Sequence, residues 1–137
     1  DGWGGVLCFD SGEVFAAGER WSDDEAGADI SVLECEAVRR ALNAFYDRLP
    51  PVGTLDLRVD NTSTEAGLRR GVARAEGLNS ALVPVLDYLA YYLPSCRLSV
   101  GYVPSGLNPA DGPSRGRDPG PVPRNCPYVS QPLRTAA

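Results

Sequence analysis

Three acidic residues stand where the chain is expected to change from one structural element to the next. Asp60 ends an alternating apolar segment, Glu34 falls in the first turn of an expected helix, and Asp111 sits in an Asn-Pro-Ala-Asp run. Carboxylates that converge from separate elements suit Mg²⁺, which prefers oxygen ligands. Two such ions about 4 Å apart can hold a phosphodiester for in-line attack by water. We therefore expect metal-dependent phosphodiester chemistry.

Each of these acids also has a simpler structural interpretation. Glu34 lies three residues after Ser31, which is the spacing of a capping box at a helix start. Asp60 is followed by cap-forming residues and would suit an Asx turn. Asp111 precedes a glycine, as in many tight turns. Spacing alone does not distinguish these structural roles from metal binding. A metal site requires that the three side chains converge in the folded protein.

The composition removes most other catalytic chemistries. The 137 residues include no His, so a Ser-His-Asp triad, a Cys-His dyad and a His-ligated metal are excluded. The cysteines are Cys8, Cys35, Cys96 and Cys126, with no Cys-x-x-Cys spacing. We expect them to be buried thiols in a reducing intracellular compartment, the cytoplasm or nucleus, although a disulfide stays open.

Basic residues cluster despite a formal charge of −5, which is unusual for a nucleic-acid binder. Arg69, Arg70 and Arg74 fall in one expected helix, with Arg70 and Arg74 four residues apart and so on one face. These residues form either an ordinary solvated helix surface or a phosphate-contacting surface with salt-dependent binding.

Hydrophobic periodicity predicts a single α/β (α+β) domain over residues 1–115, with a mixed central sheet and helices packed on its faces. A proline-rich extended tail follows over residues 116–137. No apolar run is long enough to cross a membrane, and no signal peptide is evident. We expect strands over residues 2–9, 13–21, 54–60 and 96–103, and a surface loop over 22–29. We expect three helices: one from Ser31 to about 49, one from about 62 to a break at Gly77, and one from Asn79 or Ser80 to about 93.

Four segments together resemble a ribonuclease H domain. They are GWGGVL at 2–7, Glu34-x-x-Ala37-Val38, VDNTST at 59–64 and YVPSGLNPADGPSR at 102–115. The likeness is to the ribonuclease H domain of reverse-transcriptase-type retroelements, the DIRS-like and VIPER-like tyrosine-recombinase retrotransposons. It covers residues 2–115.

This resemblance implies a ribonuclease H-like fold and cleavage of the RNA strand of an RNA–DNA hybrid. It implies that Glu34, Asp60 and Asp111 are catalytic and hold two Mg²⁺ or Mn²⁺ ions. The residues expected to contact nucleic acid are Asn61, Thr62, Arg69, Arg70, Arg74, Ser114 and Arg115.

The sequence departs from this family at its start. The family carries its first catalytic Asp on a central strand that precedes the Gly-Trp-Gly run, whereas Asp1 is too close to Gly2 to match it. The chain also contains no Met, so we expect it to be part of a longer product. The missing strand would be supplied by the upstream reverse transcriptase region or by another chain, or it has been lost together with activity. We expect that something fills its place.

Three hypotheses follow. The first is an active ribonuclease H domain of a retroelement polyprotein. The second is an inactive ribonuclease H-like scaffold in a larger ribonucleoprotein assembly. The third is an integrase-like or resolvase-like nuclease, which a preference for duplex DNA over hybrid would reveal.

Overall fold

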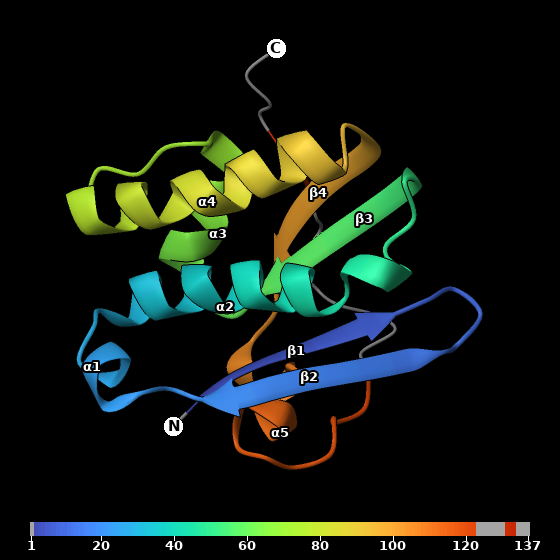
Figure 1. Ribbon diagram of the computed structural model, residues 1–137, viewed down its shortest axis with the longest axis horizontal. Coiled ribbons are helices and arrows are strands. Elements are labelled where there is room, and N and C mark those ends of the chain that lie inside the picture. Colours follow the sequence, from blue (N-terminus) through green and yellow to red (C-terminus); the bar gives the residue numbers. More distant parts are fainter. Residues whose placement is uncertain (1, 123–130, 134–137) are drawn as a thin grey trace.

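The computed structural model describes residues 2–122 and 131–133 as a mixed α+β fold (Figure 1). In chain order the elements are β1 (Gly2–Cys8), β2 (Val14–Arg20), α1 (Asp23–Ala26), α2 (Ile30–Ala44), η1 (Tyr46–Arg48), β3 (Val52–Val59), α3 (Thr62–Arg70), α4 (Glu76–Tyr92), β4 (Ser95–Tyr102), η2 (Ser105–Leu107), α5 (Asp111–Ser114) and β5 (Gln131–Pro132). The predicted class, a mixed fold of helices and strands, is confirmed. All four strands predicted from the sequence form, within two residues of the expected bounds.

The first two strands form an antiparallel hairpin. Its register runs from Gly2 opposite Arg20 to Cys8 opposite Val14. At the turn, the amide of Phe9 donates to the Glu13 carbonyl over 2.9 Å. Gly12 adopts a φ of +96°, a conformation that strongly favours glycine. The Asp-Ser-Gly signal therefore gives the turn that its residue types predict.

The other strands form a second sheet of order β3-β4-β5. β3 and β4 are parallel from Val52 opposite Ser95 to Val59 opposite Tyr102, and β5 is antiparallel to β4. The crossover from β3 to β4 contains α3 and α4, as a parallel connection requires. No strand pairing joins the hairpin to this sheet within the described residues.

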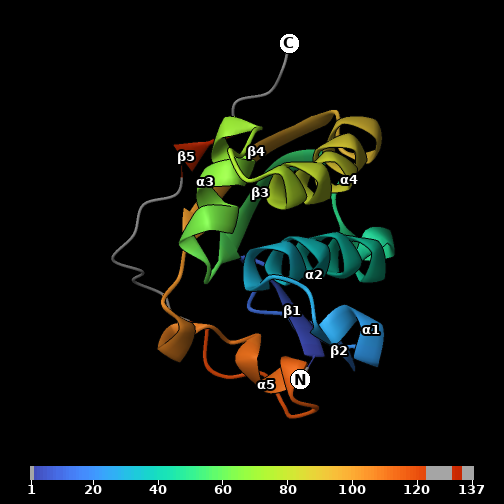
Figure 2. The same ribbon diagram turned by 90° about the vertical axis from the view of Figure 1, so that its left-hand side faces the viewer.

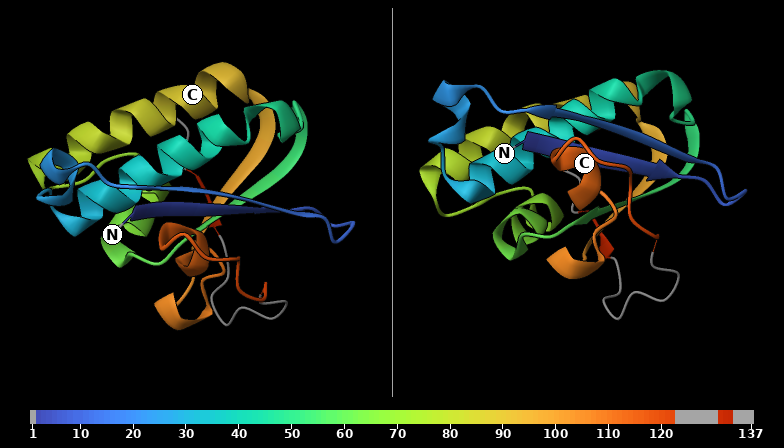
Figure 3. Two further views of the ribbon diagram at one scale, coloured as in Figure 1. Left: turned by 60° about the horizontal axis from the view of Figure 1, so that its bottom comes forward. Right: turned by 90° about the horizontal axis from the view of Figure 1, so that it is seen from below.

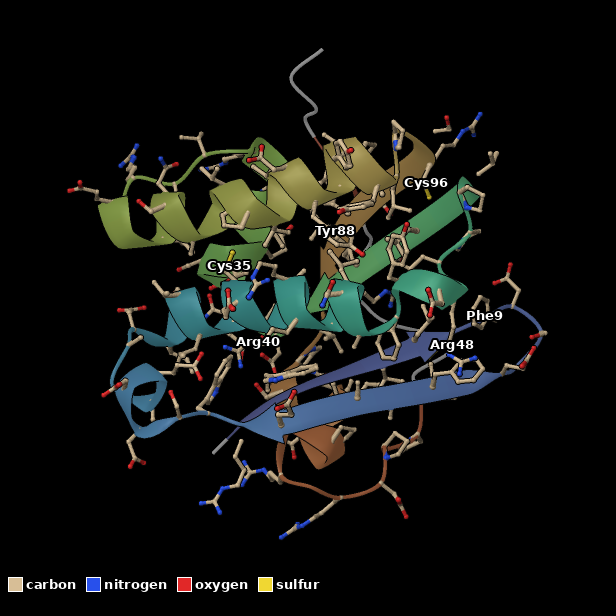
Figure 4. All side chains as sticks on the ribbon, viewed as in Figure 1. Phe9, Cys35, Arg40, Arg48, Tyr88 and Cys96 are labelled. Carbon is tan, nitrogen blue, oxygen red and sulfur yellow. The ribbon has the colours of Figure 1, made fainter. Side chains whose placement is uncertain are left out.

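Helices α2 and α4 lie side by side and provide much of the core, as the side view shows (Figure 2). The Cys35 thiol on α2 donates to the Ala81 carbonyl on α4 over 3.1 Å. The Tyr88 hydroxyl on α4 donates to the Leu42 carbonyl on α2 over 3.1 Å, and Cys35 and Tyr88 both lie between the two helices (Figure 4). The fully buried core side chains include Cys35, Leu68, Leu82, Val85, Leu89 and Val100.

The start of α2 differs from the capping box predicted at Ser31. Asp29 is the N-cap, and its carboxylate accepts from the Ser31 amide over 2.9 Å. A capping box does form in the predicted loop over residues 22–29, between Ser22 and Glu25 of the one-turn helix α1. Arg40 of α2 forms an ion pair with Glu25, which ties α1 to α2. The correction matters because it frees Glu34 from a capping role.

The boundaries of α3 and α4 also differ from prediction. Gly71, at a φ of +78°, ends α3 after Arg70, so Arg74 lies in the connection and not on a helical face shared with Arg70. α4 begins at Glu76 and includes Gly77, the expected break. The side chain of Asn79, an expected cap, instead accepts from the Ala73 amide over 3.0 Å. Burial of the apolar side of α4 outweighs the weak helix propensity of glycine.

The short helix α5 packs directly against the hairpin, on the side away from α2 (Figure 3). A Cβ atom at Gly4 would lie 2.4 Å from the Ser114 amide nitrogen and 2.5 Å from the Ala110 carbonyl oxygen. At Gly18 it would lie 2.4 Å from the Pro113 carbonyl oxygen. The Gly-rich character of the hairpin is therefore required by this close backbone approach.

Parts of the predicted tail return to the domain. The Gly120 amide donates to the Pro109 carbonyl over 3.0 Å, and the Leu133 amide donates to the Leu98 carbonyl over 3.2 Å. Leu133 is buried against the core. Cys126 and the rest of the tail over residues 123–130 and 134–137 lie outside the described residues. The thiols of Cys8, Cys35 and Cys96 are free; Cys35 is buried as expected, Cys96 is half-buried, and Cys8 is exposed, contrary to the expectation. No helix among the described residues is long and apolar enough to cross a membrane.

Candidate functional site

Two of the three acidic residues predicted to form the site, Glu34 and Asp60, lie within hydrogen-bonding distance of each other. Glu34 projects from the second turn of α2, and Asp60 follows the last residue of β3, so residues 26 positions apart in the chain face each other. The pKa of Glu34 is raised to about 7, and burial is the largest cause. The charge of Asp60 and a hydrogen bond that protonated Glu34 donates to Asp60 are the other two causes of this rise. Glu34 therefore keeps its proton up to about neutral pH beside the Asp60 carboxylate.

A third side chain fixes the orientation of Asp60. Asn108, in the loop after β4, donates from Nδ2 to Oδ2 of Asp60 over 3.0 Å. Its Oδ1 accepts from the Ala110 amide over 3.0 Å, and its backbone carbonyl accepts from the Asp111 amide over 3.1 Å. Asn108 thus links the carboxyl end of β3 to the start of α5.

Hydrogen bonds of Asn61 and Thr64 hold the connection between β3 and α3 in place. Asn61 caps α3, and its Oδ1 accepts from the Thr64 amide over 2.9 Å and the Thr64 hydroxyl over 3.1 Å. The same oxygen accepts from the Ser31 hydroxyl of α2 over 3.3 Å. The buried Thr64 hydroxyl also reaches the Ser31 carbonyl over 3.0 Å. These hydrogen bonds join the start of α2 to the start of α3. Ser31 lies three residues before Glu34 and Asn61 directly follows Asp60, so the bonds hold the backbone that positions both acids.

Asp111 is not brought into this group. It lies at the start of α5 with a side chain that is 56% exposed, and Arg115 pairs with it over 3.4 Å. Within residues 2–122 and 131–133, no three acidic or thiol side chains gather closely enough to hold a metal ion. The structure therefore assembles Glu34 with Asp60 and connects Asp111 to them only through the backbone around Asn108.

The donor set fits one hard cation better than two. Mg²⁺ commonly binds through one or two carboxylates and keeps its remaining positions for water and substrate phosphate. Glu34 and Asp60 provide such a pair. The ligands expected for a second ion would have to include Asp111, which the described structure places elsewhere.

A cavity of about 710 Å³ opens beside the acidic pair. Glu34 and Asn108 line one end of it, together with Val59 at the end of β3. Its walls are residues 4–10 of the hairpin and residues 54–59 of β3, and α2 forms its floor through Ala37, Val38 and Ala41. Glu34 is therefore accessible from a predominantly apolar hollow between the two sheets.

The residues predicted to contact nucleic acid fall into two groups. The first group has partners within the fold. Asn61 caps α3, and Arg69 forms an ion pair with Glu65 over 3.1 Å. The Ser114 hydroxyl donates to the Asp111 carbonyl over 2.6 Å, and Arg115 forms an ion pair with the Asp111 carboxylate. Thr62 is exposed at the start of α3. Arg70 and Arg74 are also exposed and line a second hollow of about 570 Å³ with Ser63. The site residue that the sequence prediction did not include is Asn108.

No family model, no curated protein and no solved structure matches this chain.

Proposed function

We propose that this chain is a ribonuclease H-like domain that hydrolyses the RNA strand of RNA–DNA hybrids with the help of a divalent cation. The observation that carries the proposal is the apposition of Glu34 and Asp60, with the Glu34 pKa raised to about 7. Neighbouring half-buried carboxylates repel each other, and a bound divalent cation removes that repulsion. An antiparallel hairpin followed by a parallel pair also fits the fold that the sequence resemblance implies.

Each group has a separate role in this proposal. Asp60, held by Asn108, presents a fixed carboxylate at the carboxyl end of β3. Glu34 completes the oxygen pair from α2. A bound Mg²⁺ or Mn²⁺ would polarise the phosphoryl oxygen and lower the pKa of attacking water. The exposed Arg70 and Arg74 would contact backbone phosphates and contribute salt-dependent affinity.

The direct test is cleavage of a labelled RNA–DNA hybrid by the purified chain in Mg²⁺ or Mn²⁺, with single-stranded RNA and duplex DNA as parallel substrates. We expect cleavage of the hybrid RNA strand that is lost with EDTA and in Asp60→Asn. Asp87→Asn, an exposed change on α4, is the matched control and keeps activity. Preferential cleavage of duplex DNA would favour an integrase-like or resolvase-like nuclease, and cleavage unaffected by Asp60→Asn would overturn the proposed site.

The second candidate function is a non-catalytic scaffold in a ribonucleoprotein assembly. The separation of Asp111 from the acidic pair favours it, because two-ion catalysis needs more ligands than Glu34 and Asp60 supply. Calorimetry separates the two candidates. A scaffold binds hybrid or RNA without Mg²⁺ and shows no Mg²⁺-dependent rise in melting temperature, whereas the proposed enzyme shows that rise and loses it in Asp60→Asn.

A further inference from the structure

The outer edge of β4 is covered by a segment from much later in the chain. β3 pairs with one side of β4, and β5 pairs antiparallel with the other side, as Figure 2 shows. The register places Val100 opposite Gln131. One residue further on, the Leu133 amide donates to the Leu98 carbonyl over 3.2 Å. We call residues 131–133 the strap.

Backbone alternation shows which groups of β4 need a partner on this edge. The Val103 amide donates to the Val59 carbonyl and so points toward β3. Backbone direction alternates along a strand, so every second residue before Val103 points the other way. These outward-facing residues are Cys96, Leu98, Val100 and Tyr102. The Cys96 amide is already used, because it donates to the Leu93 carbonyl over 3.2 Å. The strap therefore lies against the middle of the edge, at Leu98 and Val100.

The proline of the strap stands where it stops a further strand from adding. Leu133 bonds to Leu98, so the next pair, Pro132 opposite Ser99, is one whose backbone groups point outward. An amide at position 132 would therefore face away from β4, and proline has none. Proline suits edge strands because it removes a donor that another strand could use. The strap thus covers one edge without offering a complete new one.

Leu133 anchors the strap to the domain. Its side chain is 9% exposed and belongs to the same core cluster as Val100. It lies opposite Leu98, which packs against that cluster. The other face of the sheet is polar here, since the Ser99 hydroxyl donates to Asp56 over 3.4 Å. One buried leucine and a short ladder therefore hold the strap, whereas a core helix such as α4 buries several side chains.

We propose that residues 131–133 form a releasable strap, and that β4, once released, pairs with β4 of a second copy of this chain. Segments with few buried contacts open more readily than the whole domain. An antiparallel pairing centred on Ser99 places Leu98 of one copy opposite Val100 of the other. Each copy then regains the backbone partners that its own strap supplied. The strap therefore keeps the chain monomeric, and it does so whether or not the acidic pair is catalytic.

The edge of β4 is complementary to itself, which favours a second copy as its partner. The strap shows that this edge accepts an antiparallel strand in the register that two β4 strands would use. A twofold contact brings the same patch of each copy together. Arg97 of one copy falls opposite Gly101 of the other, so no like charges face each other across the pair. Leu98 and Val100 of both copies then lie on one apolar face.

The test releases the strap with Leu133→Asp, which places a charge in the core, and keeps it in the matched control Leu133→Met. Sedimentation equilibrium over a concentration series should give 14.6 kDa for the original chain and the control, and a mass that approaches twice that value for Leu133→Asp. Adding Ser99→Cys should link the released dimer by a disulfide, because residues directly opposite in such a pair lie close enough. Ser99→Cys with the strap intact should form no such link.

Amide hydrogen exchange in the unaltered chain tests release without any substitution. The Val100 amide, which faces the strap, should exchange at least about tenfold faster than the Leu57 amide, which faces β4 from inside the sheet. Equal exchange at the two amides would show that the strap opens only with the whole domain and would overturn its release. A folded Leu133→Asp chain that stays monomeric, or an original chain that is already dimeric, would overturn the pairing of β4 and the role of the strap.

Discussion

The side-chain amide of Asn108 donates to Oδ2 of Asp60 over 3.0 Å. This hydrogen bond joins the loop after β4 to the carboxyl end of β3, and it leaves the other Asp60 oxygen for Glu34 or a cation. Asn108 also holds the backbone of Ala110 and Asp111. It therefore positions both the acidic pair and the start of α5.

Removing the charge of Asp60 should lower the pKa of Glu34. In Asp60→Asn the repulsion disappears, but burial, the largest cause of the shift, remains. We expect the Glu34 pKa to fall from about 7 and to stay above 4.5. Titration of the Glu34 carboxyl carbon by NMR in EDTA measures this. A Glu34 pKa equal in the two proteins would show that the acids do not interact.

Stability should fall as the pH rises in metal-free buffer. The Glu34 pKa is 4.5 in the unfolded chain and about 7 when folded, so the folded state binds more protons between those values. Ionising Glu34 should cost about 1–2 kcal/mol, after allowance for solvent screening at a half-buried site. Urea unfolding at pH 5 and pH 8 would show this loss, and Glu34→Gln should remove it. A pH-independent wild type would contradict the prediction.

The Asn61 cap should contribute measurably to stability. Asn61→Ala removes an acceptor from the Thr64 amide and hydroxyl and from the Ser31 hydroxyl. We expect a loss of about 1–2 kcal/mol in the free energy of unfolding. Asn61→Asp keeps the acceptor and should lose much less. Equal losses in the two variants would show that capping is not the cause.

Close packing of α5 on the hairpin should make Gly4 intolerant of any side chain. Gly4→Ala places a methyl group against the Ser114 nitrogen and the Ala110 oxygen, which are backbone atoms and cannot rotate away. We expect destabilisation of about 1–3 kcal/mol. Gly106→Ala is the control, because no atom lies within 4 Å of a Cβ there. A melting temperature that Gly4→Ala leaves unchanged would show that α5 does not pack as described.

Salt dependence should reveal the role of Arg70 and Arg74. The double change to Gln should weaken hybrid binding and reduce the slope of log K against log salt by about 1–2. Arg39→Gln is the matched control, because the guanidinium of Arg39 is already paired with Glu36 on α2. Fluorescence anisotropy over a salt series gives both quantities. An unchanged slope would assign the phosphate contacts to other residues.

The sequence by itself determined the four long strands, the approximate positions of α2, α3 and α4, and one part of the site, but not the one-turn helices α1 and α5. Alternation in residues 54–60 and 96–103 marks strands because a pleated strand places successive side chains on opposite faces. The residue types of Asp10, Ser11 and Gly12 likewise specify the hairpin turn. Asp60 at a strand end and Glu34 near the start of α2 are positions that the pattern identifies, although taken singly the pattern favours a helix cap for Glu34 and an Asx turn for Asp60.

Tertiary structure decided which of these residues meet. Whether Glu34 caps a helix depends on which residue, Ser31 or Asp29, starts α2, and packing against α3 and α1 determines that choice. α5 packs onto the glycines of the hairpin, where Asp111 pairs locally with Arg115 and does not join Glu34 and Asp60. The hollow between β1 and β3 has no local signature, because it arises from the spacing of strands that are far apart in the chain.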